Sequence, residues 1–212
     1  MDAFSTFMRS EGFTEFVPPK IVSAGAEGGA DLFEVDYFGE KAYLNQSPQV
    51  YKQMMVGVFK KVFVVAPVFR AEKHSTTRHI NEFEGLDFEM GFIDSFEDVM
   101  AVEARFMVYL FDFLKKNYAL ELEEIGVELP EIKQIPQFKF VEAKKIVAEK
   151  YGREFRNSND LDPEEERLIG EYVKEEYGSP LVFITHYPSK KRPFYAMDDP
   201  EDPKLALSFD LL

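Results

Sequence analysis

Hydrophobic residues near the start of the chain recur at helical spacing. Phe7 and Met8 lie three and four positions after Phe4, which predicts a helix over residues 2–10 that ends near Gly12. Farther along, polar and apolar residues alternate, or short apolar runs are bounded by loop residues, as in strands. Strands are predicted at residues 14–17, 32–37, 41–44, 61–69 and 82–92, with a helix from Pro48 to about Val56 between the third and the fourth.

The strand predicted over residues 82–92 has an unusual face. Alternation places Phe83, Gly85, Asp87 and Glu89 on one side of it. A buried strand does not normally present a glycine and two carboxylates in succession unless something polar lies against it. We therefore expect a polar ligand or a cationic partner at this face.

The second half of the chain carries longer helical patterns. Ser95 begins a helix with an apolar stripe, and a shorter helix is expected over residues 141–151. Asp162 followed by Pro163 predicts the start of another helix, which runs to Tyr177. Helices grouped between strands indicate an α+β fold, with an antiparallel sheet flanked by helices. Further strands are predicted at residues 181–186, 194–197 and 205–212.

Length and composition fit one folded domain. The chain has 212 residues, of which 45% are hydrophobic and 30% charged, and this is too apolar for a disordered chain. The absence of cysteine excludes disulfides and thiolate metal sites, and it fits a cytoplasmic setting. No apolar run reaches the roughly eighteen residues that a membrane span needs, so no membrane partner is expected.

The net charge of −14 bears on nucleic-acid binding. Proteins that hold nucleic acid by phosphate neutralisation usually carry a basic face. Any contact of this chain with RNA must therefore depend on basic residues placed locally.

The residues on either side of the basic loop 71–79 carry the most specific chemistry. Arg70 and Glu72 follow one strand, and Phe83 and Asp87 lie on the next, where residues two or four apart point the same way. Arginine can bind phosphate oxygens through two bonds, glutamate can accept from an amino group, and phenylalanine can stack on a base. The face suits a nucleotide, although a hairpin with an ordinary Arg–Glu pair is the alternative for these residues taken singly.

This arrangement resembles motif 2 of the class II aminoacyl-tRNA synthetases, where a strand ending in FR-x-E, a loop and a returning strand hold ATP. Other segments are similar to the aspartyl branch of that family. Residues 13–19 resemble motif 1, residues 26–29 the mobile loop that closes over aspartate, and residues 46–53 the amino-acid-binding segment. The resemblance covers the whole chain and is least specific between Asn117 and Gly178.

The resemblance implies an α+β class II catalytic fold that activates aspartate with ATP and passes it to tRNA. Arg70 is the implied catalytic residue, which contacts the α-phosphate and bridges to aspartate. Glu72 would contact the adenine amino group and Phe83 the adenine ring. The implied ATP-binding residues are Arg70, Glu72, Arg78, His79, Ile80 and Phe83.

The resemblance also assigns the aspartate pocket. Lys52 would pair with the side-chain carboxylate, Gln49 and Asp87 would orient the amino group, Glu27 would join when its loop closes, and Arg70 would bridge to the substrate. Taken singly, Lys52 and Glu27 are more often a solvated charge and a turn residue. Asp87 differs, because a carboxylate in apolar surroundings needs a cationic partner on physical grounds.

The reaction that the resemblance implies requires charge neutralisation more than proton transfer. The α-carboxylate of aspartate is ionised at neutral pH, so it attacks the α-phosphorus without a general base. Positioned cations and Mg²⁺ are the expected aids to this step. Asp210 is the candidate Mg²⁺ ligand in this chain, and an ordinary carboxylate at a strand end is its alternative.

Several family elements lie outside this sequence. These are the anticodon-binding barrel, the glutamate that binds Mg²⁺, the glycine-rich segment with the arginine that clamps aspartate, and motif 3. We expect residues 1–212 to be a partial catalytic domain with motifs 1 and 2, its C-terminal part missing, and to be inactive by itself. A homodimer through motif 1 is also expected, because Phe4, Phe7 and Phe13 would otherwise lie near an open surface.

Three other functions remain open from the sequence. An asparaginyl-tRNA synthetase and a synthetase-like asparagine synthetase share the fold, and Lys52 argues against the first because a cation suits a carboxylate better than an amide. A non-catalytic dimerisation or ligand-binding module is the third. The sequence does not decide whether asparagine tRNA would be charged as well as aspartate tRNA.

Overall fold

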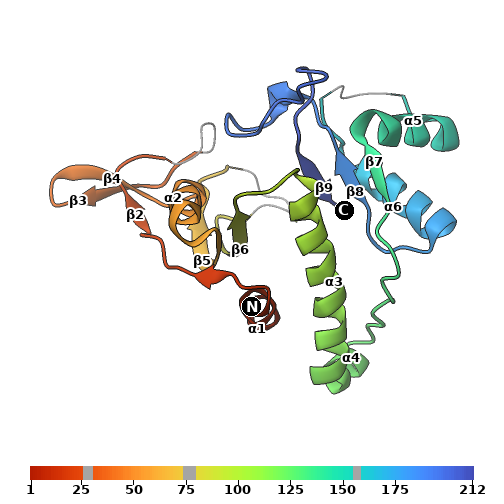
Figure 1. The fold of residues 1–212 in the computed structure, drawn as a ribbon, viewed down its shortest axis with the longest axis horizontal. Helices are drawn as coiled ribbons and strands as arrows, with labels where there is room; N and C mark the ends of the chain where they lie inside the picture. Colours follow the sequence, from red (N-terminus) through yellow and green to blue (C-terminus); the bar gives the residue numbers. More distant parts are fainter. Residues whose placement is uncertain (26–30, 74–79, 155–158) are drawn as a thin grey trace. The chain divides into compact units, whose positions relative to one another are not determined.

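The computed structural model describes residues 1–25, 31–73, 80–154 and 159–212 (Figure 1). The chain divides into two compact units, Met1–Asp94 and Ser95–Leu212, which are described separately. The assignment of all 212 residues to one catalytic domain stays a prediction. Among the described residues, no helix combines the length and apolar character needed to cross a bilayer.

Unit 1 contains a three-stranded sheet in the order β1-β5-β6. Strands β5 and β6 pair antiparallel along their whole length, from Lys61 opposite Met90 to Phe69 opposite Glu82. Strand β1 joins β5 in parallel, which requires the long crossover that contains α2. The elements of unit 1 are α1 (Asp2–Ser10), β1 (Thr14–Glu15), β2 (Ile21–Val22), β3 (Glu34–Tyr37), β4 (Glu40–Leu44), α2 (Gln49–Phe59), β5 (Lys61–Phe69) and β6 (Glu82–Met90).

Most of these elements match the sequence prediction. Helix α1 and strand β5 have the predicted bounds, whereas α2 continues three residues beyond Val56. Strand β2 was not predicted, and it completes a second, antiparallel sheet in the order β2-β4-β3. At the turn between β3 and β4, Phe38 and Gly39 have φ values of 56° and 87°. Glycine tolerates this conformation without strain.

The aromatic residues of α1 and the segment after it are buried inside unit 1. The ring of Phe4 meets Phe63 edge-on with centroids 5.8 Å apart, and Phe13 meets Phe88 at 5.6 Å. Phe4, Phe7 and Phe13 are each no more than 5% exposed. The sequence argument that these rings need a second copy to cover them is therefore wrong, because β5 and β6 of the same chain supply the cover.

Unit 2 is built around the sheet β7-β8-β9, in which β7 and β8 are parallel and β8 and β9 antiparallel. The helices α5 and α6 form the crossover between the parallel strands. The parallel pairs in both units were not part of the predicted antiparallel sheet. The elements are α3 (Glu97–Asn117), α4 (Ala119–Glu124), β7 (Gln137–Lys139), α5 (Phe140–Tyr151), α6 (Pro163–Tyr177), β8 (Phe183–Thr185), the 3₁₀ helix η1 (Ser189–Lys191) and β9 (Phe209–Leu211).

Two predictions for unit 2 differ from the structure. Residues 194–197 do not form a strand, because the N–H of Ala196 donates to the carbonyl of Pro193 at 2.9 Å and closes a turn. The strand predicted over residues 205–212 is confined to β9, with isolated bridges at Leu205 and Ala206. Helix α4 and strand β7 were not predicted. In contrast, α6 begins and ends where the sequence placed it.

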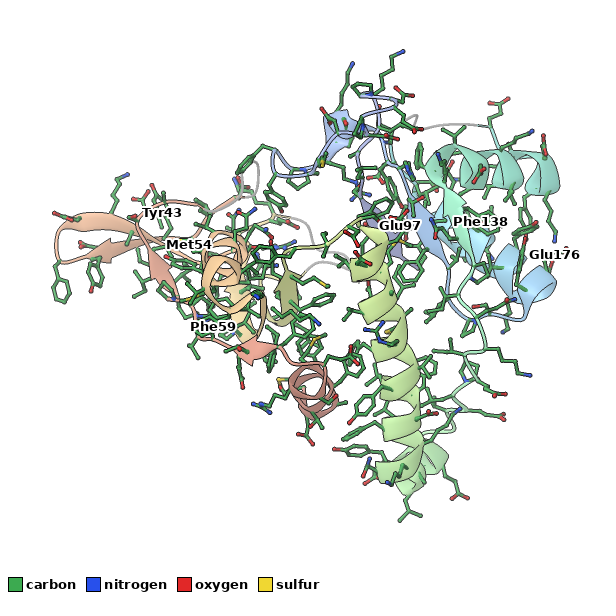
Figure 2. The ribbon with its side chains drawn as sticks, in the orientation of Figure 1. Tyr43, Met54, Phe59, Glu97, Phe138 and Glu176 are labelled. Carbon is green, nitrogen blue, oxygen red and sulfur yellow. The ribbon has the colours of Figure 1, made fainter. Side chains whose placement is uncertain are left out.

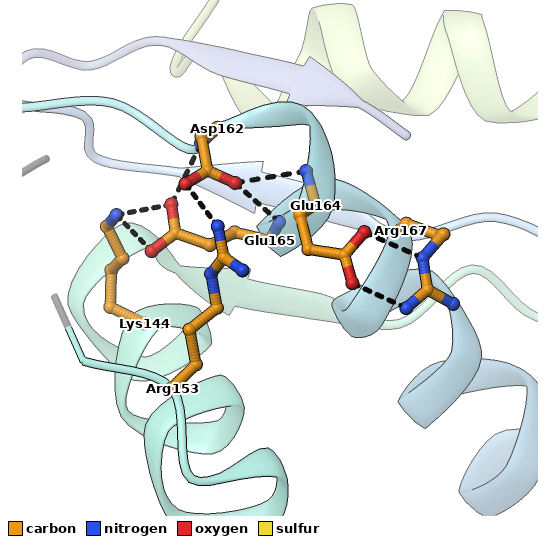
Figure 3. Close-up of polar contacts among 6 residues, drawn as sticks. All are labelled: Lys144, Arg153, Asp162, Glu164, Glu165 and Arg167. Atoms are coloured by element: carbon orange, nitrogen blue, oxygen red, sulfur yellow. Dashed lines mark hydrogen bonds and ion pairs between the residues drawn. The ribbon is translucent and has the colours of Figure 1, made fainter. Parts of the chain in front are cut away.

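A charged cluster lies within the core of unit 2 (Figure 3). Lys144 of α5 donates to both oxygens of Glu165 on α6, at 2.7 and 2.6 Å, and both side chains are almost fully buried. Asp162 caps α6 and is held by Arg153 at 2.6 Å. The buried apolar core of unit 2 includes Phe140, Ala143, Val147, Leu161, Leu168, Ile169, Val173, Val182, Ile184 and Tyr187.

Candidate functional site

The segment before α2 is fixed by short-range hydrogen bonds. The N–H of Ser47 donates to Oδ1 of Asn45, and the N–H of Gln49 donates to Oγ of Ser47, both at 3.2 Å. These side chains satisfy backbone donors at the start of the helix and set its first turn. Gln49 and Lys52, three residues apart, therefore lie on the same side of α2.

Helix α2 buries a charge and exposes apolar residues. Lys52 is buried, whereas Met54 and Phe59, labelled in Figure 2, are 56% and 47% exposed. A buried lysine is rare unless it is paired. The orientation of α2 therefore serves the contact between Lys52 and the sheet rather than the burial of every apolar side chain.

Lys52 lies between two carboxylates of β6. Its Nζ is 2.7 Å from Oδ1 of Asp87 and 3.9 Å from Oε2 of Glu89. The Nε2 of Gln49 donates to the same Oε2 of Glu89 at 3.4 Å. The side chain of Lys52 is 8% exposed, and those of Asp87 and Glu89 are about one quarter exposed. These four side chains, Gln49, Lys52, Asp87 and Glu89, form what we call the α2–β6 cluster.

The α2–β6 cluster contains one more carboxylate than cations. Burial raises the pKa of Glu89 above its ordinary value, Lys52 and the Gln49 hydrogen bond act in the opposite direction, and Asp87 adds to the rise. Two carboxylates around one ammonium leave an excess negative charge in a half-buried place. Such a site favours an additional cation, for example the ammonium group of an amino acid.

Arg70 and Phe83 lie together at the other end of the same strand pair. The guanidinium carbon of Arg70 is 5.5 Å from the centroid of the Phe83 ring. Asn81 fixes this end, because its carbonyl accepts from the N–H of Arg70 and its Nδ2 donates to the carbonyls of Arg70 and Glu72. A cation that can bind a phosphate thus lies over an aromatic ring that can stack on a base.

The other predicted site residues of unit 1 lie between β5 and β6 or outside the described residues. Ile80 is 66% exposed just before β6, and the carbonyl of Glu72, three residues after the end of β5, accepts from Nδ2 of Asn81 at 3.2 Å. Glu27, Arg78 and His79 lie outside the described residues. Their predicted roles are untested.

Glu89 was not among the predicted site residues, although it belongs to the α2–β6 cluster. Alternation along β6 had placed it on the same face as Asp87. That shared face was the signal that a second carboxylate belongs to the site.

Asp210, the candidate Mg²⁺ ligand, lies on β9 of unit 2. Both of its oxygens accept hydrogen bonds from Arg192, at 3.2 and 2.8 Å, and the guanidinium carbon of Arg192 is 3.8 Å from the centroid of the Tyr187 ring. Burial and the charge of Asp210 raise the pKa of Tyr187, and they also raise that of Glu103. Within the described part of the chain, no three acidic or histidine side chains converge as metal ligands. These residues alone therefore do not form a Mg²⁺ site.

Comparison with known proteins identifies relatives of the whole chain. Residues 1–212 match the family described as tRNA synthetases class II (D, K and N). The chain is 50% identical to the aspartate–tRNA(Asp/Asn) ligase of Deinococcus radiodurans, with 100% of this chain and 50% of that protein aligned. It is 42% identical to the aspartate–tRNA(Asp) ligase of Pyrococcus abyssi, with 97% of this chain and 47% of that protein aligned.

Solved structures give the same picture. The asparaginyl-tRNA synthetase of Pyrococcus horikoshii, complexed with asparaginyl-adenylate, superposes with a TM-score of 0.87 at 31% identity, covering 100% of this chain and 49% of that chain. The aspartyl-tRNA synthetase of Entamoeba histolytica gives 0.85 at 31% identity, covering 100% of this chain and 40% of that chain. The chain spans about half the length of the curated relatives it matches.

Proposed function

Since the chain belongs to the class II tRNA synthetases of the D, K and N group, we propose that it is part of the catalytic domain of an aspartate–tRNA ligase. Such an enzyme activates aspartate with ATP to give aspartyl-adenylate and pyrophosphate, and then transfers aspartate from the adenylate to tRNA. The relatives named as aspartate–tRNA ligases support this assignment over their whole alignment with the chain.

The observation that carries the proposal is Lys52 between Asp87 and Glu89. Aspartate brings one ammonium and two carboxylates. Its ammonium would enter beside Asp87, where negative charge is in excess, and its side-chain carboxylate would take Lys52. Asparagine would offer an amide to a desolvated ammonium, which leaves that charge without a counter-charge from the substrate.

ATP would bind at the other end of the strand pair. The adenine would stack on Phe83, and Arg70 would reach the α-phosphate. The α-carboxylate oxygen forms a bond to the α-phosphorus as the bond to the pyrophosphate oxygen breaks. The chain supports this step by holding both anions and neutralising the charge on the phosphates. Binding of Mg²⁺, for which the described residues alone do not form a site, is a further proposal that the family supports. The family also supports tRNA binding and a cytoplasmic location.

A homodimer through motif 1 also remains a proposal. Its support is the resemblance of residues 13–19 to motif 1 of the family, and not the rings of α1, which are buried within the chain. Light scattering at micromolar concentration should detect a dimer. A monomer at every concentration would contradict the proposal.

Pyrophosphate exchange tests the proposed activity. We would compare residues 1–212 with a version extended at both ends by the corresponding segments of the Deinococcus radiodurans relative. The extended version should exchange pyrophosphate with aspartate and not with asparagine, while residues 1–212 alone should be near background. Exchange with asparagine would indicate an asparagine enzyme, and binding without exchange in the extended version would indicate a non-catalytic module.

A further inference from the structure

Glu89 holds two groups of α2 through one atom. Its Oε2 accepts from Nε2 of Gln49 at 3.4 Å and lies 3.9 Å from Nζ of Lys52. On the neighbouring strand it stands opposite Val62, which is apolar and buried. Among the described residues of unit 1, the charged and polar groups that act on Glu89 are Gln49 and Lys52 from α2 and Asp87 from its own strand.

Folding alone gives little reason for this carboxylate. Lys52 already has a partner in Asp87 at 2.7 Å, and that pair is balanced in charge. Glu89 adds a second half-buried negative charge, which is costly in such a place. A residue that costs stability and contacts two ligand-binding groups is typical of a functional site.

The contact also decides which way the amide of Gln49 points. An ionised carboxylate can only accept hydrogen bonds, so the NH₂ end of the amide must face Glu89. The amide oxygen is then turned away from Glu89. That oxygen is an acceptor, which the ammonium of a substrate requires.

We propose that Glu89 is a positioning residue of the aspartate pocket, which orients the amide of Gln49 and retains the ammonium of Lys52 when Asp87 turns to the substrate. This inference rests on the proposed function. When the aspartate ammonium engages Asp87, Lys52 loses its 2.7 Å partner. Among the described residues, Glu89 is then the carboxylate within 4 Å that holds the Lys52 ammonium in place for the side-chain carboxylate of the substrate.

Steady-state kinetics of the extended version give the first test. Glu89→Ala should raise the KM for aspartate about tenfold, because the Gln49 amide loses its acceptor, while kcat and the KM for ATP stay near their original values. Glu89→Gln should bring the KM for aspartate back to within about threefold, since an amide oxygen can still accept from Gln49. Glu84→Ala, on the opposite face of β6, is the matched control.

The second test needs no activity. In residues 1–212, the side-chain amide signal of Gln49 is identified by NMR from its loss in Gln49→Glu. It should shift in Glu89→Ala and stay in place in Glu84→Ala.

The outcomes separate the two proposals. If the extended version shows no aspartate-dependent pyrophosphate exchange, the proposed function is contradicted, and this inference with it, whatever the NMR result. With exchange present, an unchanged KM for aspartate in Glu89→Ala, failure of Glu89→Gln to restore it, or an unmoved Gln49 signal overturns the positioning role alone. If Glu89→Ala lowers kcat/KM for aspartate and for ATP by the same factor and also lowers the melting temperature, the role of Glu89 is purely structural. That outcome would also overturn the positioning role.

Discussion

The two units each contain a lysine that bridges a helix to a neighbouring carboxylate, and the two clusters differ in balance. In unit 2, Lys144 and Glu165 are at most 3% exposed, and Glu165 also accepts from the N–H of Asp162 at 2.8 Å. In unit 1, Lys52 is shared by Asp87 and Glu89, which are about one quarter exposed.

This difference separates a structural cluster from the proposed binding site. Lys144 and Glu165 pair with each other, Glu165 also accepts from the N–H of Asp162 in the capping box, and both side chains are closed off from solvent. The α2–β6 cluster has an excess carboxylate and access to solvent. The closed and balanced pair supports folding, and we propose that the open and unbalanced cluster binds a ligand.

The largest expected effect is on stability in the closed cluster. Lys144→Met leaves Glu165 charged and buried without its partner, and should lower the free energy of unfolding by about 3–5 kcal/mol. Lys52→Met should cost far less, about 1 kcal/mol, because water reaches Asp87 and Glu89. Urea unfolding measures both. The double variant Lys144→Met/Glu165→Leu should recover most of the loss, and equal losses at Lys52 and Lys144 would break the comparison.

The second effect is on aspartate use, and it should fall on the open cluster. In the extended version, Lys52→Ala should lower kcat/KM for aspartate about 10²–10³-fold, because it removes one preorganised charge contact. Pyrophosphate exchange is the measurement, with Lys144→Met/Glu165→Leu as the control that should retain activity. Unchanged aspartate kinetics in Lys52→Ala would remove Lys52 from the pocket.

The third effect is on nucleotide binding, and it compares one cation–aromatic contact in each unit. Phe83→Ala and Arg70→Ala should each weaken ATP binding, by about 1–3 kcal/mol for the lost stack. In unit 2, Lys150 lies over Tyr172 at 4.8 Å in a similar cation–aromatic contact, and Lys150→Ala should leave ATP binding unchanged. Calorimetric titration with ATP distinguishes them. If neither unit 1 variant binds more weakly than the original chain, the motif 2 face has been misassigned.

The smallest effect is a pH dependence of opposite sign in the two units. The pKa of Asp162 is held below its ordinary value, chiefly by the hydrogen bond from Arg153. The ionised Asp162 therefore stabilises the fold at pH values above the ordinary aspartate pKa, and this stabilisation is lost as the pH falls through the lowered pKa. The pKa of Glu89 is raised by burial. Glu89 therefore stabilises the fold at pH values below the ordinary glutamate pKa, and this stabilisation is lost as the pH rises through the raised pKa.

Hydrogen exchange of amides in α6 and β6, followed from about pH 3 to about pH 7, reads the two units separately. Protection in α6 should increase with pH in the acid range, and Asp162→Asn should flatten this trend. Ionisation of Glu89 should lower the protection of amides in β6 as the pH rises, and Glu89→Gln should abolish this pH dependence. Trends of the same sign in both units, unaltered by these variants, would contradict the assignment.

The sequence by itself determined the elements whose signals are local. The spacing of Phe4, Phe7 and Met8 placed α1, the apolar run 61–69 placed β5, and the cap at Asp162 placed the start of α6. Alternation also placed Phe83, Gly85, Asp87 and Glu89 on one face before any partner was known. Helical period, strand alternation and capping depend on residues within a few positions of one another, so they can be read along the chain.

Only the tertiary structure decided which distant groups meet. The contact of Gln49 with Glu89 spans 40 positions, and the burial of Phe4 depends on Phe63. The engagement of Asp210 by Arg192, and the parallel pairing of β1 with β5, follow from how separate segments pack. These contacts depend on chain reversals, crossovers and side-chain burial that no local pattern encodes, because residues far apart in sequence interact only after the chain has folded.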